Sequence, residues 1–189
     1  VLAHHGLPAA RSSVYDHAGQ RFLEVRRFDR EGPSGRRALF SLMALDAEFV
    51  GSGERWPHAV RALARSGVVT ADSVATTDVL WAFGVLIGNT DMHSGNLSFL
   101  PDEGRPYRIA PAYDMTCMAF APTAGGDLPM RELPLRVSSE VTSSAWHKAL
   151  EMATDFHARL ARCDALSPGF APCADALTRH IGEASQRIA

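Results

Sequence analysis

The sequence predicts an α+β fold that is mainly helical, with two β-hairpins packed against the helices. Five segments have the apolar spacing of helices, at 41–51, 56–67, 70–88, 140–163 and 171–187. Two stretches have strand-like composition on both sides of a turn, at 12–28 and 96–111. The chain of 189 residues is long enough for one domain with a real core, and we find no repeat or interdomain linker.

The N-terminal segments are predicted from turn residues and the apolar residues between them. Strand-forming residues such as Val14 flank "HAGQ", where Gly19 suits the turn of a hairpin. Residues 1–6 resemble the end of a helix, with Gly6 as its C-terminal cap. The following "DREGPSGRR" is predicted to be a loop because it is rich in Gly, Pro and Ser.

The third helical segment is the strongest candidate for a central element of the fold. Either Thr70 or Asp72 can cap its start, and its second half, "VLWAFGVLIG", contains no charged residue. A helix that is apolar on all sides is usually buried within a domain. Residues 115–137, by contrast, are expected to be irregular because they are rich in Pro and Gly.

Composition restricts the classes of function. The net charge is −2, and the 19 basic residues are 18 Arg and the single Lys148, so no direct binding to nucleic acid is expected. No apolar run reaches the ~20 residues that span a bilayer, so we expect no membrane partner. The odd cysteine count, without metal-ligand spacing, favours reduced thiols and a cytoplasmic location. The N-terminus has no signal peptide and no initiator Met, which suggests a processed or truncated piece.

Three polar residues follow the apolar helix in an arrangement that suits phosphoryl transfer. Asp91 and Asn96 have the spacing Asp-x-x-x-x-Asn, and Asp114 lies just past the second hairpin. Phosphoryl transfer needs one carboxylate that accepts the proton of the attacking hydroxyl, and further oxygen ligands that hold Mg²⁺ against the nucleotide phosphates. Asp91 and Asn96 could also form only a helix-stop turn, since Asp and Asn favour such positions. The presence of Asp114 after a hairpin favours the catalytic interpretation.

Taken together, "IGNTDMHSGNLSFL", "RIAPAYDM" and "FLEVRRFDR" resemble the HipA-like serine/threonine kinases, the toxin family of bacterial toxin–antitoxin systems. The resemblance covers about residues 1–165. "SLMALDAEFVG" and "FAPTAGGDLP" also resemble the subgroup of the protein called YjjJ or HipH. The family implies a protein-kinase-like C-terminal lobe with an N-terminal β-hairpin that remains from the first lobe. Residues 1–28 would be the end of that lobe and the hinge, and residues 29–189 the helical lobe with the catalytic and metal-binding loops.

The resemblance also implies roles for individual residues. Asp91 would be the catalytic residue, while Asn96 and Asp114 would bind Mg²⁺ and, with His93, the phosphates of ATP. The adenine would meet the main chain of the hinge residues Arg26, Arg27 and Phe28. The family usually has an acidic residue where this chain has Arg26. A protein substrate and a DNA-binding antitoxin are the implied partners.

Other polar groups have simpler interpretations. "PTAGGDLP" lacks the strand–loop–helix context of a phosphate cradle and is predicted to be a surface loop. The adjacent His4 and His5 are expected to be exposed to solvent rather than bound to metal. Asp29 and Arg30 could bind a ribose or simply open the loop.

Two functions remain open from the sequence. The first is the catalytic lobe of an ATP-dependent protein serine/threonine kinase, because Asp91, Asn96 and Asp114 are all present. The alternative is a kinase-like module that binds a protein without phosphorylating it. This alternative rests on the lack of a Lys and a glycine-containing phosphate loop before Arg26. The chain by itself is accordingly expected to be a poor or inactive kinase.

Overall fold

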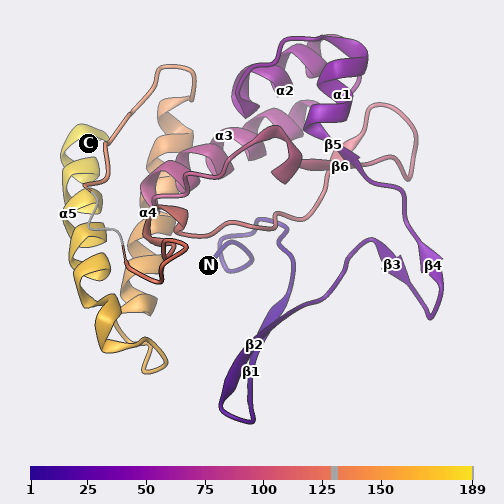
Figure 1. Cartoon of the computed structure of the whole chain (residues 1–189). Helices are drawn as coiled ribbons and strands as arrows, with labels where there is room; N and C mark the ends of the chain where they lie inside the picture. The colour runs from indigo at the N-terminus through magenta and orange to yellow at the C-terminus, as the bar shows by residue number, and fades with distance from the viewer. Residues whose placement is uncertain (129–131, 189) are drawn as a thin grey trace.

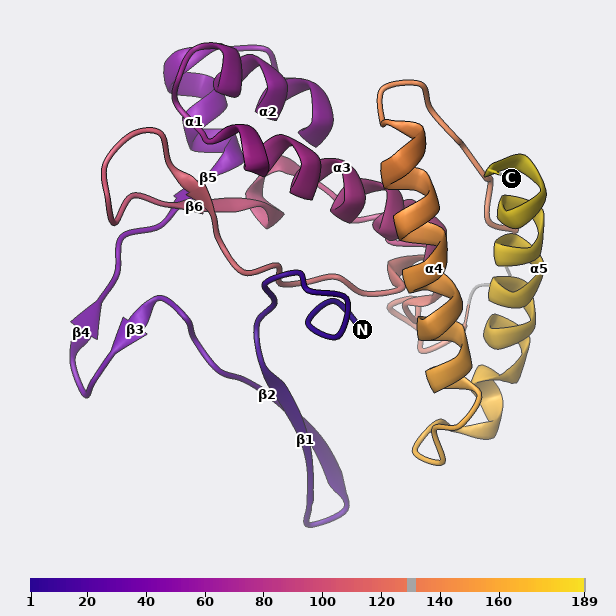
Figure 2. The same ribbon diagram turned by 180° about the vertical axis from the view of Figure 1, so that it is seen from behind.

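The computed structural model describes residues 1–128 and 132–188 and confirms the mainly helical α+β fold. Helix α3 runs through the centre of the molecule, with α1 and α2 at one end and the antiparallel pair α4 and α5 at the other (Figures 1 and 2). The helices are α1 (Leu42–Phe49), α2 (Trp56–Arg65), α3 (Ala71–Leu86), α4 (Ser143–Leu160) and α5 (Ala171–Ile188). Each of the five predicted helices is therefore present, with ends within a few residues of the expected positions.

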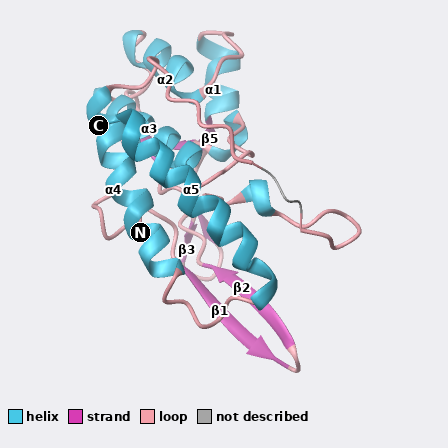
Figure 3. Cartoon of the chain, turned by 90° about the vertical axis from the view of Figure 1, so that its left-hand side faces the viewer, coloured by secondary structure: helices cyan, strands magenta, loops and turns pink. Residues whose placement is uncertain are grey.

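The N-terminal segment forms a hairpin that projects from the helical body (Figures 1 and 3). Strands β1 (Ser12–His17) and β2 (Gln20–Val25) pair antiparallel, as predicted. Residues 1–6 form a single hydrogen-bonded turn that ends as a helix does, as predicted. Gly6 has a φ of +78°, its N–H donates to the Ala3 carbonyl at 3.2 Å, and the Leu7 N–H donates to the Leu2 carbonyl at 3.0 Å. The segment predicted to be a loop contains a second, short ladder of β3 (Arg30–Glu31) and β4 (Gly35–Arg36).

A three-stranded antiparallel sheet supports the polar loop. Its strands are β5 (Phe40–Ser41), β6 (Ser98–Leu100) and β7 (Arg108–Ile109), in the order β5-β6-β7. β6 and β7 are the predicted second hairpin, whereas β5 is not evident from its own sequence. Single 3₁₀ turns complete the fold: η1 (Ser94–Asn96), η2 (Met118–Phe120) and η3 (Pro168–Phe170).

The core has two parts that meet at α3, which explains why the second half of this helix is apolar on all sides. The first part lies where α3 packs on α4 and α5, and includes Phe83, Trp146, Met152 and Leu177. The second lies under α1, α2 and β6, and includes Leu42, Trp56, Leu63, Leu80 and Phe99. Burying each such side chain contributes about 1.5–3 kcal/mol. Among the helices of the described residues, none combines the length and the apolar character needed to cross a bilayer.

Candidate active site

The polar loop after α3 is joined to the Asp114 loop by one buried side chain, Asn89. Its Oδ1 accepts a hydrogen bond from the backbone N–H of Asp91 at 3.0 Å, and its Nδ2 donates to the carbonyl oxygen of Asp114 at 3.4 Å. Asn89 is only 5% exposed, so these bonds are made away from competing water. The structure therefore brings the backbones of Asp91 and Asp114 to one buried amide group.

Within the loop, Asn96 and Asp91 are held together directly. The Asn96 Nδ2 donates a hydrogen bond to the carbonyl oxygen of Asp91 at 2.9 Å. This bond leaves the Asn96 Oδ1, the atom that a hard cation prefers, directed away from the backbone of Asp91. The Asp91 side chain is 54% exposed, so its carboxylate is accessible to a group from solvent.

His93 has a defined orientation next to Asp91. Its Nδ1 accepts a hydrogen bond from the Gly95 N–H at 3.0 Å, which places the proton of the neutral ring on Nε2. That Nε2 lies 4.0 Å from the Asp91 Oδ1. The main chain is held from the other side, because the indole Nε1 of Trp56 donates to the His93 carbonyl at 2.9 Å. The imidazole Nε2–H can therefore donate a hydrogen bond to an anion beside Asp91.

Asp114 lies on a backbone that few residues other than glycine adopt. Its φ of +51° is in the left-handed region, which Asp tolerates better than most side chains. The preceding Tyr113 anchors it, since its hydroxyl donates to the Gly95 carbonyl at 2.9 Å and lies 2.7 Å from the Ser98 Oγ. An unusual backbone held by a specific contact is a feature of functional sites.

Asp114 is exposed and lines a cavity of about 550 Å³. The cavity is mostly apolar and lies between the β1–β2 hairpin, α3 and α4, with Val25, Phe83 and Phe156 among its lining residues. Asp91, His93 and Asn96 are not among the residues that line it. The predicted site residues thus approach one another through the Asp91 and Asp114 loops, and the cavity adjoins only the second loop.

A glycine of α3 makes room for both loops. A Cβ atom at Gly84 would overlap the Sδ of Met92 and would lie 3.4 Å from the Sδ of Met115. Met92 follows Asp91, and Met115 follows Asp114. The side chains that follow Asp91 and Asp114 therefore both pack against α3 at Gly84, where the absence of a side chain leaves room for them.

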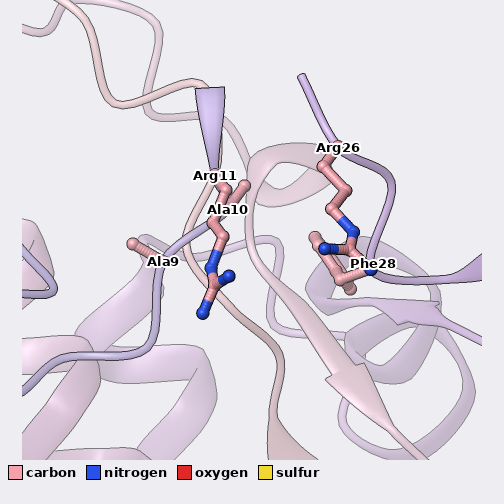
Figure 4. A pocket seen from close by; sticks show the side chains of 5 residues that line it. All are labelled: Ala9, Ala10, Arg11, Arg26 and Phe28. Atoms are coloured by element: carbon pink, nitrogen blue, oxygen red, sulfur yellow. The ribbon is translucent and has the colours of Figure 1, made fainter. Parts of the chain in front are cut away.

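The hinge residues Arg26, Arg27 and Phe28 lie near the Asp114 loop. The Phe28 and Tyr113 rings have centroids 6.0 Å apart. Arg27 forms two hydrogen bonds to the Asp29 carboxylate at 2.6 and 2.5 Å, and this guanidinium holds the pKa of Asp29 at about 2. Asp29 is thus engaged by Arg27, while Arg26 and Phe28 border a pocket of about 400 Å³ (Figure 4).

The donor set fits a magnesium ion held mainly by its nucleotide. In residues 1–128 and 132–188, no three His, Cys, Asp or Glu side chains are grouped as ready-made metal ligands. Asn96 and Asp114 each supply a hard oxygen, and Mg²⁺ commonly takes one or two protein carboxylates together with phosphates and waters. The chemistry of Asn96 and Asp114 therefore suits Mg²⁺ bound to a nucleotide.

Three supporting residues are not evident from the sequence reasoning. Asn89, Gly84 and Tyr113 each position the two loops through contacts that their neighbours in sequence do not reveal. Asn89 carried a signal, because it is a polar residue between the end of an apolar helix and Asp91. Tyr113 and Gly84 gave no such signal in the sequence, since an aromatic residue just after a strand and a glycine in an apolar helix are both common.

The chain is similar in sequence to one protein family and to one curated protein. The profile of the HipA-like C-terminal domain matches residues 1–182. The Escherichia coli (strain K12) protein "Toxin YjjJ" is 38% identical over 190 residues, covering 100% of this chain and 43% of that protein. The chain thus spans less than half the length of this curated relative.

Two solved structures share the fold. HipA in the Shewanella oneidensis MR-1 complex of HipA, HipB and operator DNA matches with a TM-score of 0.63 at 16% identity, over 99% of this chain and 53% of that chain. The Helicobacter pylori proinflammatory kinase CtkA matches with a TM-score of 0.64 at 12% identity, over 99% of this chain and 77% of that chain. At these identities the likeness concerns the fold alone.

Proposed function

Because this chain belongs to the family of HipA-like C-terminal domains, we propose that it is the catalytic lobe of an ATP-dependent protein serine/threonine kinase. The observation that carries the proposal is the Asn89 side chain, which joins the Asp91 loop to the Asp114 loop. A phosphoryl-transfer site needs both loops at one reacting phosphate. The chain covers 43% of its curated relative, so the proposed activity is that of the longer parent protein.

Asp91 is the proposed base. Its exposed carboxylate accepts the proton of a serine or threonine hydroxyl as the oxygen attacks the terminal phosphate of ATP. His93 donates from Nε2 to a phosphate oxygen, because its Nδ1 is occupied by Gly95. The main chain of the hinge, Arg26 to Phe28, contacts the adenine.

Asn96 Oδ1 and the Asp114 carboxylate would hold Mg²⁺ at the phosphates. When bound, the ion neutralises the charge on the transferred group. Two features support this role: the left-handed backbone at Asp114, and the hydrogen bond from the Asn96 Nδ2 to the Asp91 carbonyl oxygen. We extend the proposal to the partners, which are a protein substrate and a DNA-binding antitoxin. The antitoxin is supported by the complex of the HipA neighbour with HipB and operator DNA. We also propose a cytoplasmic location, which the three free thiols support.

One observation favours a second function for this chain alone. Its single lysine, Lys148, lies on α4 and its Nζ is 3.8 Å from the Glu151 carboxylate. The chain therefore brings no lysine to the nucleotide phosphates. In this second function it binds a partner protein, or Mg·ATP weakly, without transferring a phosphate.

The test uses the full-length parent with Asp91→Asn, Asp114→Asn and the control Asp164→Asn, whose carboxylate is exposed in a turn. Asp91→Asn should reduce phosphoryl transfer by about 10²–10⁴-fold and retain Mg·ATP binding, since it removes only the base. Asp114→Asn should weaken Mg·ATP binding as well, and Asp164→Asn should change neither. Parental turnover by Asp91→Asn would refute the assignment of this loop.

A further inference from the structure

We propose that Arg11 and Arg26, hereafter the arginine pair, form a binding site for a phosphate group at the base of the β1–β2 hairpin. Both residues line the pocket of about 400 Å³ beside the hinge, together with Ala9, Ala10 and Phe28. The kinase reaction proposed above uses the main chain of Arg26 and assigns no role to either guanidinium. The two guanidinium groups are therefore available for a role beyond the proposed kinase reaction.

The ladder of the hairpin sets the two arginines opposite each other. Ser12 pairs with Val25, and beyond this pair the Arg26 N–H donates to the Arg11 carbonyl at 2.8 Å. Residues directly opposite in an antiparallel ladder have their side chains on the same face. Two like charges in this position destabilise the ladder unless an anion compensates them.

No carboxylate of the described residues compensates these charges. Within residues 1–128 and 132–188, neither guanidinium has an Asp or Glu oxygen within 4.0 Å. This holds even for Glu24, which lies two residues before Arg26 on the same face of the hairpin. Neighbouring arginines differ in this respect, since Arg21 pairs with Asp16 and Arg27 with Asp29. The arginine pair thus combines two positive charges with a pocket and with no internal partner.

The walls of the pocket indicate the class of ligand. Figure 4 shows the two arginine side chains extending from neighbouring segments, with Phe28 beside Arg26. Guanidinium groups bind phosphate oxygens through two parallel hydrogen bonds, and a doubly charged phosphate matches two of them. The Phe28 ring gives a planar wall next to the charges. The ligand is accordingly a phosphate ester or a polyphosphate other than the ATP of the proposed kinase reaction, whose phosphates are assigned to His93, Asn96 and Asp114.

The direct test is calorimetric titration of the chain with pyrophosphate in the absence of Mg²⁺. The variants are Arg11→Gln and Arg26→Gln, and the control is Arg36→Gln, an exposed arginine of β4 that does not line the pocket. Each pocket variant should weaken pyrophosphate binding about tenfold or more, as expected for loss of a charge-assisted hydrogen bond. Arg36→Gln should leave the affinity unchanged.

Further titrations separate this site from the ATP site of the proposed kinase. Pyrophosphate should bind equally well to chain saturated with ATP, and Arg11→Gln should weaken the binding of pyrophosphate but not of ATP. Displacement of pyrophosphate by ATP would show that the phosphate belongs to the kinase nucleotide and would overturn the proposal. The absence of saturable pyrophosphate binding, equal weakening by Arg36→Gln, or binding of polyglutamate in place of pyrophosphate would each overturn the proposal.

The two proposals fail separately. Arg11 lies outside the hinge, so adenosine binding should persist in Arg11→Gln. A chain that binds pyrophosphate through the arginine pair but does not bind adenosine would contradict the hinge contact of the proposed kinase and would leave the arginine pair supported.

Discussion

The side-chain oxygen of Asn89 accepts a hydrogen bond from the backbone N–H of Asp91 at 3.0 Å. The same side chain donates to the carbonyl of Asp114, so one amide group uses both of its polar atoms to join two loops. The relation makes Asn89 a positioning residue, because it acts on the proposed base and metal ligand through their backbones.

Replacing Asn89 by alanine should destabilise the chain. The Asp91 N–H and the Asp114 carbonyl would each lose a partly buried hydrogen bond, and each such bond contributes about 0.5–1.5 kcal/mol to the free energy of unfolding. Urea denaturation of the purified chain measures this change. Thr90→Ala, an exposed substitution in the adjacent position, is the control and should stay within about 0.5 kcal/mol of the wild type. Equal effects of the two variants would contradict the structural role of Asn89.

A methyl group at Gly84 should be harmful for a different reason. Gly84→Ala forces the Met92 side chain away from α3. Overpacking costs about 1–3 kcal/mol, and the flexibility of Met92 with the better helix propensity of alanine places the net destabilisation at the low end of that range. Gly182→Ala is the matched control, because it also lies in a helix but its Cβ would meet no atom within 4 Å. That variant should stabilise the chain by about 0.5–1 kcal/mol, through the better helix propensity of alanine. Thermal unfolding of both variants should therefore show shifts of opposite sign.

Asp46 should contribute stability that depends on pH. Burial acts to raise its pKa, but hydrogen bonds from the Ser52 hydroxyl at 2.7 Å and from the Gly53 N–H at 2.8 Å outweigh burial, and the pKa lies below its usual 3.8. Because the folded pKa is depressed, the stabilisation is complete above the unfolded pKa and is lost as the pH falls through the folded value.

The corresponding experiment compares Asp46→Asn with the wild type from pH 7 down to pH 3. The variant should be less stable at pH 7, and the difference should shrink below about pH 4. Glu48→Gln, on the exposed side of the same helix, is the control and should show no such change. A difference in unfolding free energy that is constant over the whole range would show that the Asp46 charge is not responsible.

The three thiols should react at different rates. Burial, with the nearby Cys173, raises the pKa of Cys117 to about 11, so its thiol is neutral at pH 8. Cys173 is buried and Cys163 is exposed. Titration with a chromogenic disulfide at pH 8 should therefore show one fast thiol in the native chain, absent in Cys163→Ser, and two more only after unfolding. Two or more fast thiols would contradict the burial of Cys173 and the partial burial of Cys117.

Local sequence patterns predict the elements whose contacts are themselves local. Helix α3 was evident from its uncharged second half, and the β1–β2 hairpin from strand residues around Gly19. Strand β5 was not evident, because Phe40 and Ser41 become a strand only by pairing with Phe99 and Ser98, nearly 60 residues away. The turn at residues 1–6, by contrast, was evident from Gly6, because a helix end capped by glycine is set by contacts within six residues.

The candidate site shows the same division. Spacing identifies Asp91, Asn96 and Asp114, since the chemistry requires these residue types in this order. Spacing does not reveal that Asn89 joins the two loops, or that Asn96 uses its amide nitrogen on Asp91. Those contacts depend on where two distant loops meet, and whether the named residues act in phosphoryl transfer stays a prediction.

The β1–β2 hairpin has a consequence for strand register. Val14 and Leu23 face each other on one side, Tyr15 and Phe22 on the other, and all four side chains are 48% exposed or more. Usually a slip by one residue would be prevented because it moves the apolar set from the core to solvent. Here both faces are similarly apolar and similarly exposed, so burial discriminates little between the two alignments.

The turn must therefore select the alignment. Ala18 and Gly19 both have positive φ, at +50° and +74°, as a two-residue hairpin turn of the right twist requires. Glycine adopts this backbone freely, whereas for an alanine it costs about 1–2 kcal/mol. The turn of the β1–β2 hairpin thus determines which side chains face the helices and which face outward. One of its two residues, Ala18, is poorly suited to the left-handed backbone that the turn requires.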